Sequence, residues 1–241
     1  MISLSMIESL EDKVTLIKDV SRINYLNKES IFLIAQYAEK LLPGIKGHIL
    51  RTAYYTKLLV NELYSRGLYQ DIIDEEFTQM LPCAAALHDI GKLMIPNHII
   101  YNKLSLNDEE RIIMRMHTDY GNEIIEEALK SNENQKFLKL SKDVVSYHHE
   151  RYDGSGYRLR LKGNEIPLGA RIVSICDIFD AMTSVRAYKD AISIEDTIAY
   201  LKETSGQVVD PELLKVFLKN EIQEKIKHSI SKYGNLSTPS I

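Results

Sequence analysis

Apolar residues recur at the spacing of an α-helix along most of this chain, and no segment alternates apolar and polar residues like a strand. In residues 46–66, for example, Ile49, Ala53 and Leu63 fall on one helical face. The same spacing predicts further helices at residues 30–42, 70–88, 107–129, 141–150, 167–183 and 193–204, and a last one from 210 onward. The pattern therefore predicts an all-α fold.

Local signals mark where several of these helices begin. Asn107 and Glu110 have the spacing of a capping box, in which each side chain bonds the backbone amide of the other residue. Ser193 and Asp210 are typical N-cap residues, and Pro167 suits a first turn. Residues 151–169 contain four glycines and Pro167, which predicts an ordered loop there.

Length and charge limit the domain count and the partners. The 241 residues allow one large domain or two small ones, at about 100–200 residues per domain. No repeat or long linker divides them, so we expect one domain at residues 26–233, a short segment at 1–25 and a tail at 234–241. The 30 Lys and Arg against 34 Asp and Glu give a net charge of −4, which argues against a protein that coats DNA or RNA.

Two cysteines, Cys83 and Cys176, cannot form a disulfide framework, and the absence of any CxxC excludes a zinc ribbon. The first residues carry acids where a signal peptide carries a basic start. No run approaches the roughly 18 apolar residues of a membrane-spanning helix. We therefore expect a cytoplasmic protein without a membrane segment.

Histidine and aspartate carry the chemical information, beginning with His88 and Asp89 at the end of the apolar stretch 83–87. A carboxylate buried there needs a metal or another strong partner, because an unpaired buried charge is costly. Gly91 is expected to permit a sharp turn, which returns Lys92 to the same site as a cation. The alternative is a helix end with a polar exit and a lysine in solvent.

The other candidates are ambiguous when each is taken alone. His148 and His149 could be a solvated pair, and His48 and His117 could be ordinary core or surface histidines. Asp177, on the apolar helix that also holds Asp180, could form a helix cap or a salt bridge. Together they are informative: His48, His88, Asp89, His117, His148, His149 and Asp177. Imidazoles and carboxylates without thiolates suit iron, manganese, zinc, cobalt or nickel. Seven ligands exceed the need of one ion, so the set predicts two ions about 3.5–4 Å apart, bridged by Asp89.

Residues 88–92, His-Asp-Ile-Gly-Lys, resemble the HD motif of the HD-domain phosphohydrolases. Residues 148–189 and 206–217 are similar to the long signature of the HD-GYP family, and the resemblance spans residues 40–220. It implies an HD-domain helical bundle with a buried metal cluster. It also implies hydrolysis of cyclic di-GMP to the linear dinucleotide, or on to GMP, by a metal-bridging hydroxide.

The resemblance also implies roles for individual residues. One divalent metal would be held by His48, His88, Asp89 and Asp177, and the second by Asp89, His117, His148 and His149. From the family, we expect iron or manganese. Lys92 would contact the scissile phosphate, Arg186 and Lys189 would hold phosphate oxygens, and Tyr157 is a candidate to stack on a base.

Two positions depart from the family pattern. Arg158 replaces the proline of Gly-Tyr-Pro, which affects loop rigidity or contact with diguanylate cyclase domains as partners. Gly44 stands where members with three metals carry glutamate, so we predict two metals. Two alternatives stay open: a non-catalytic receptor or scaffold for the dinucleotide, and a phosphodiesterase for another cyclic dinucleotide such as cyclic GMP-AMP. The oligomeric state is open.

Overall fold

The computed structural model describes residues 31–32, 35–36, 38–39, 47–102, 104–130, 135–185 and 190–233. The expected segment 1–25 and tail 234–241 lie outside these residues, so the proposed domain limits stay predictions. Within the described part α-helices dominate, and the sole β-type pairing there is an isolated bridge between Ser205 and Val209. The predicted all-α fold is confirmed.

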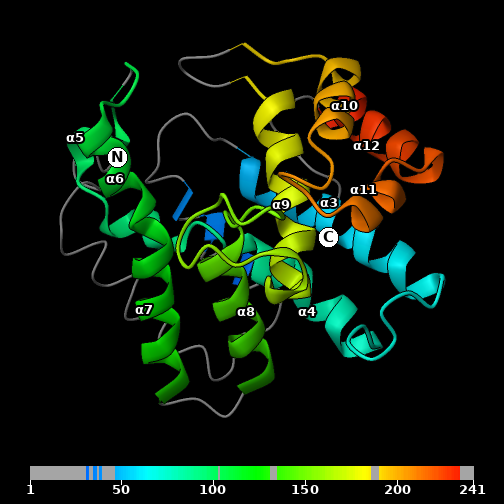
Figure 1. The fold of residues 1–241 in the computed structure, drawn as a ribbon, viewed down its shortest axis with the longest axis horizontal. Helices are drawn as coiled ribbons and strands as arrows, with labels where there is room; N and C mark the ends of the chain where they lie inside the picture. Colours follow the sequence, from blue (N-terminus) through cyan, green and yellow to red (C-terminus); the bar gives the residue numbers. More distant parts are fainter. Residues whose placement is uncertain are drawn as a thin grey trace, which may run out of the picture.

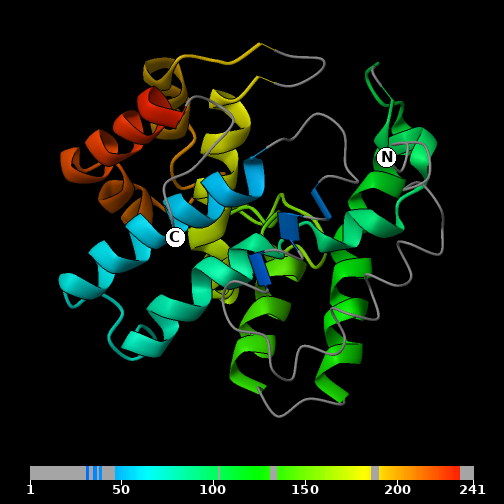
Figure 2. The same cartoon turned by 180° about the vertical axis from the view of Figure 1, so that it is seen from behind.

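The longer helices form a bundle around two central elements, α3 (His48–Ser65) and α9 (Leu168–Thr183). On one side lie α7 (His117–Lys130) and α8 (Gln135–Tyr147), which run side by side in Figure 1. On the other side lie α10 (Ile194–Glu203), α11 (Pro211–Phe217) and α12 (Asn220–Tyr233). From behind, α4 (Glu75–Ala86) runs beside α3 (Figure 2).

The core follows from helices that are apolar on every side. α9 buries most of its residues, as expected for a sequence with little amphipathic contrast. The aromatic ring of Phe179 on α9 meets Tyr55 edge-on at 5.6 Å and Phe217 at 5.3 Å between centroids. These contacts fix α9 between α3 and α11.

The predicted helix starts are largely confirmed. Asn107 and Glu110 form both hydrogen bonds of a capping box. Ser193 accepts the amide of Asp196 at 3.0 Å, and Asp210 accepts the amide of Glu212 at 2.9 Å. These side chains satisfy amides that the first turn of a helix leaves without a backbone partner.

Some predicted boundaries were wrong. The helix predicted from residue 70 begins at Glu75, because Asp74 caps it by accepting the amide of Phe77 at 2.7 Å. The helix predicted at 141–150 begins at Gln135 and ends at Tyr147. Three short helices went unpredicted: the 3-10 helices η3 (Ile90–Met94) and η4 (Gly163–Glu165), and α5 (Asn97–Ile100).

The single helix predicted at 107–129 is two helices, α6 (Asp108–Arg115) and α7, which meet at Met116. The ring of His117 hydrogen-bonds to the carbonyl of Met114 at 2.7 Å, which competes with the regular helical ladder at this point. The break follows from a side-chain interaction, which hydrophobic spacing does not reveal.

Gly91 has no side chain, which allows the backbone of η3 to lie against the backbone of α7. It does not have the left-handed backbone conformation that our expectation of a sharp turn implied. A Cβ atom at Gly91 would lie 1.9 Å from the carbonyl oxygen of His117 and 2.4 Å from the amide of Gly121. A side chain is therefore excluded at the point where the HD segment meets α7.

Gly91→Ala should lower the free energy of unfolding by about 3 kcal/mol or more, because the new methyl group overlaps rigid backbone. Gly121→Ala is the matched control. Its Cβ would lie 3.3 Å from that of Val145, and its gain in helix propensity of about 1 kcal/mol offsets the crowding. Urea unfolding followed by circular dichroism measures both variants, and equal losses would contradict this account.

No described helix has the length and apolar character needed to cross a membrane.

Candidate metal centre

Side chains from five separate segments meet in the interior of the bundle. The segments are the start of α3, the residues after α4, the start of α7, the residues after α8, and the middle of α9. They bring together all seven residues predicted as ligands: His48, His88, Asp89, His117, His148, His149 and Asp177.

Most of these residues lie at helix ends, which explains how neighbours in sequence face one site. Adjacent residues within a helix point about 100° apart. His148 and His149 follow the last residue of α8, and their ring centroids are 4.1 Å apart. The structure thus places both members of the histidine pair at the same cluster.

The carboxylate of Asp89 lies at the centre of the cluster. Its Oδ2 atom is 3.2 Å from Nε2 of His88 and 4.0 Å from Nε2 of His48. Its Oδ1 atom is 3.3 Å from Nε2 of His117 and 3.8 Å from Nε2 of His148. The two oxygens of Asp89 therefore face different pairs of imidazoles.

Two groups of side chains have the geometry to hold a divalent metal ion, and both contain Asp89: His48, His88 and Asp89, and Asp89, His117, His148 and His149. Asp177 adds an oxygen to the first group, since its Oδ1 atom is 3.3 Å from Nε2 of His48 and 3.8 Å from Nε2 of His88. The two groups match the two predicted ligand sets.

Backbone carbonyls fix the orientation of three imidazoles. Nδ1 of His88 donates to Ala85, Nδ1 of His117 to Met114 at 2.7 Å, and Nδ1 of His148 to Val144 at 3.0 Å. A carbonyl oxygen only accepts, so the proton of each neutral ring sits on Nδ1. Each Nε2 atom therefore presents a lone pair to the cluster.

These lone pairs face one another and face carboxylate oxygens. Nε2 of His117 is 3.4 Å from Nε2 of His148 and 3.3 Å from Oδ1 of Asp89. Oδ1 of Asp89 is buried and has no hydrogen-bond partner among the described residues. Acceptors that converge without a donor repel one another unless a cation lies between them, so the cluster fits divalent metal binding.

Burial keeps several of the imidazoles neutral. It lowers the pKa of His117 to about 4 and that of His149 to about 3, and holds the pKa of His148 well below its usual range. Neutral imidazole is the form that ligates a metal.

The carboxylate of Asp89 is held in its charged form. Burial alone would raise the pKa of Asp89, but the positive charge of Lys92 outweighs it and keeps the pKa well below the usual value. The Nζ atom of Lys92 lies 2.5 Å from Oδ2 of Asp89. The site therefore offers a carboxylate and neutral imidazoles together.

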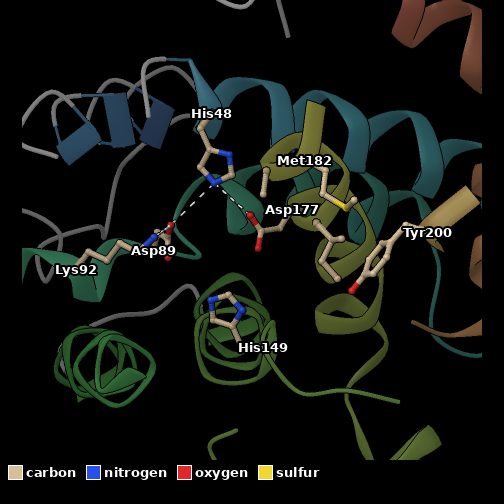
Figure 3. A pocket seen from close by; sticks show the side chains of 9 residues that line it. His48, Asp89, Lys92, His149, Asp177, Met182 and Tyr200 are labelled. Carbon is tan, nitrogen blue, oxygen red and sulfur yellow. Dashed lines mark hydrogen bonds and ion pairs between the residues drawn. The ribbon is translucent and has the colours of Figure 1, made fainter. Parts of the chain in front are cut away.

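A pocket of about 470 Å³ opens onto this cluster. Its polar wall includes Asp89, Lys92 and Asp177, and its other side includes Met182 and Tyr200 (Figure 3). The predicted phosphate-binding residues Arg186 and Lys189 lie outside the described residues.

Comparison with known proteins supports this interpretation, since the family model for the HD domain matches residues 49–213. The chain belongs to the HD domain family. It is 36% identical to a probable cyclic di-GMP phosphodiesterase of Vibrio cholerae, over 79% of this chain and 44% of that protein. It is 40% identical to a cyclic di-GMP phosphodiesterase of Thermotoga maritima, over 62% and 39% of the two chains.

A 3′3′-cGAMP-specific phosphodiesterase of Vibrio cholerae is 33% identical, over 80% of this chain and 35% of that protein. This HD domain chain thus spans less than half the length of each of these relatives. Among solved structures, Bd1817, an HDGYP protein from Bdellovibrio bacteriovorus, covers 90% of this chain and 65% of its own, with a TM-score of 0.55 and 16% identity. That likeness supports the fold.

The loop after His149 places Tyr157 beside the cluster of this HD domain. The ring of Tyr157 stacks on His149, with centroids 4.9 Å apart and planes 30° apart. Arg158, where the resemblance has proline, pairs with Asp119 on α7 at 2.9 Å. One face of Tyr157 is thus already occupied, and its contact with a base stays a prediction.

Asp180 orients His48, a role that our candidate ligand set did not include. Oδ2 of Asp180 lies 2.7 Å from Nδ1 of His48, and Oδ1 accepts Nε of Arg51 at 2.6 Å. The sequence signal was present: Asp180 lies three residues after Asp177, as Arg51 lies three after His48. The sequence did not show that α3 and α9, which carry these residues, pack against each other.

The same carboxylate changes the protonation of the ring. Burial alone would lower the pKa of His48, but the hydrogen bonds that its ring donates to Asp177 and Asp180 raise the pKa to about 9. A metal bound at Nε2 would displace one proton, and Asp180 would retain the other on Nδ1.

Asp180→Asn should weaken divalent metal binding by about 10- to 100-fold, because His48 and Arg51 donate to different oxygens of Asp180 and the amide replaces one of these oxygens by an NH2 donor. Asp210→Asn is the matched control. Asp210 forms a buried ion pair with Arg171, with 2.5 Å between the two charged groups, and neither residue belongs to the metal cluster. Calorimetric titration with Mn²⁺ compares the variants. Equal loss of metal affinity in both would show that any buried ion pair has this effect.

Proposed function

We propose that this HD domain is a metal-dependent phosphodiesterase that hydrolyses a cyclic dinucleotide, with cyclic di-GMP as the first candidate. The observation that carries the proposal is the convergence of unprotonated ring nitrogens from His88, His117 and His148 on the shared carboxylate of Asp89. A buried core gains nothing from such an arrangement without cations. The names of the relatives supply the substrate class.

The ligand set supports two ions, as we predict. His48, His88, Asp89 and Asp177 would hold one ion, and Asp89, His117, His148 and His149 the other. Mixed imidazole and carboxylate ligands suit iron, manganese, zinc, cobalt or nickel, and the family resemblance leads us to assign iron or manganese as the native metals. When bound, these ions supply Lewis acidity and lower the pKa of coordinated water.

The chain's own cations complete the proposed chemistry. Lys92 lines the pocket with its side chain 18% exposed, where its ammonium group offsets charge that develops on the phosphate oxygens. We assign Arg186 and Lys189 to the same phosphate, on the resemblance alone. Cleavage of one ester opens the ring to the linear dinucleotide, and a second cleavage gives GMP.

A related substrate is the second candidate, because 3′3′-cGAMP-specific phosphodiesterases also stand among the relatives. A receptor or scaffold role gains no comparable support, since a protein that only binds has no need of the full ligand set. A cytoplasmic location and contact with diguanylate cyclase domains stay predictions.

Asp89→Ala should abolish both metal binding and turnover, because it removes the bridge between the two ligand groups. Lys92→Ala should retain the metals and lower kcat by about 100-fold, the scale for removal of one charge-stabilising group. Anaerobic purification, metal analysis and chromatography of the cyclic di-GMP products measure these effects.

Lys142→Ala is the control for loss of a lysine, since Lys142 pairs with Glu126 at 2.7 Å on the surface of α8. Normal hydrolysis by Asp89→Ala would disprove the bridge assignment. Loss of metal in Lys92→Ala would give this lysine a structural role instead. Removal of the metal by a chelator should stop turnover, and Mn²⁺ or Fe²⁺ should restore it.

A further inference from the structure

A second pocket of about 290 Å³ adjoins the metal pocket. His149, Ile178 and Tyr200 line both, so the two share a wall. Figure 3 shows His149 and Tyr200 on the side of the metal pocket away from His48. The second pocket is therefore the space next to a ligand whose phosphate lies at Asp89 and Lys92.

The remaining walls of this pocket combine cations and apolar surface with the carboxylate of Glu150, whose Oε1 atom accepts the amides of Leu159 and Arg160. Arg115 and Arg151 bring two guanidinium groups, while Tyr157 and Val208 bring aromatic and aliphatic surface. Neither guanidinium forms an ion pair with any described carboxylate. Two arginines without acidic partners beside apolar walls suit a flat, polar-edged ligand such as a nucleobase.

Arg115 is an exposed residue whose guanidinium contacts the first of two stacked rings that lead to the metal cluster. Its guanidinium carbon lies 5.2 Å from the ring centroid of Tyr157, at the distance of a cation–π contact. Tyr157 in turn stacks on His149. The donors of Arg115 are therefore positioned relative to the site of cleavage without being engaged by a carboxylate.

We infer that the second pocket takes one guanine base of the cyclic dinucleotide and that Arg115 recognises the O6 and N7 atoms of that base. The inference rests on the proposed function and adds base selectivity to it. An arginine offers donors alone, and guanine presents two acceptors on this edge. Adenine presents one acceptor and one donor there, so Arg115 disfavours adenine.

Arg115→Lys tests this inference, because lysine keeps the charge and loses the two-pronged geometry. We expect the ratio of kcat/KM for cyclic di-GMP over cyclic di-AMP to fall by roughly 5- to 150-fold, with 3′3′-cGAMP between them. Arg111→Lys is the control, since Arg111 lies one turn earlier on α6 and pairs with Asp108 at 3.6 Å. It should leave the ratio unchanged.

The outcomes separate this inference from the proposed function. Equal loss of turnover on all three dinucleotides would mean that Arg115 binds a phosphate, and no loss would mean that it binds nothing; either result overturns the inference alone. Failure of the wild-type protein to cleave any dinucleotide would overturn the proposed function. Calorimetric titrations with GMP and AMP then test whether the pocket prefers guanine. Tighter binding of GMP that is lost in Arg115→Lys supports the inference, and equal binding of GMP and AMP overturns it.

Discussion

The buried negative charge of Asp89 is the constraint around which this domain is arranged. A carboxylate removed from water needs compensation, and Lys92 supplies one positive charge to Oδ2 alone. The opposite oxygen, Oδ1, faces the ring nitrogens of His117 and His148, which have no proton to give. The interior is therefore incomplete electrostatically without cations, and the fold that surrounds it holds the acceptors in place.

Helix ends are what make such a convergence possible. In or just after the last turn of a helix a ring can turn back onto a backbone carbonyl, and the carbonyls of Ala85, Met114 and Val144 accept the Nδ1 protons of the histidines that follow them. The backbone thus orients three of the rings. His48 begins its helix and has no such carbonyl before it, so the carboxylate of Asp180 takes this role from the neighbouring α9.

The sequence was informative where the interaction is local. The capping box at Asn107 and Glu110 follows from a short spacing, and the identity of the clustered residues follows from ligand chemistry. The break at Met116 was missed, because it depends on a ring bonding to a carbonyl. The ion pair between Arg51 and Asp180 joins residues that are 129 positions apart in the sequence, and only the packing of α3 on α9 brings them together. The sequence indicated that Gly91 is structurally important. A glycine is needed there because the backbone of α7 lies against it, and a local sequence pattern does not reveal such a contact.

The departure at Arg158 illustrates how the fold replaces one restraint by others. Proline fixes φ near −65°, whereas Arg158 has φ of 132° and Arg160 has φ of 58°, so proline cannot occupy this backbone path at residue 158. Such conformations cost roughly 1–3 kcal/mol each and need support from their surroundings. The carboxylate of Glu150 accepts the amides of Leu159 and Arg160 at 2.6 and 3.0 Å, and Asp119 holds the Arg158 guanidinium. The loop that carries Tyr157 to the metal cluster is therefore held by charged side chains at the positions where the family pattern relies on a rigid ring.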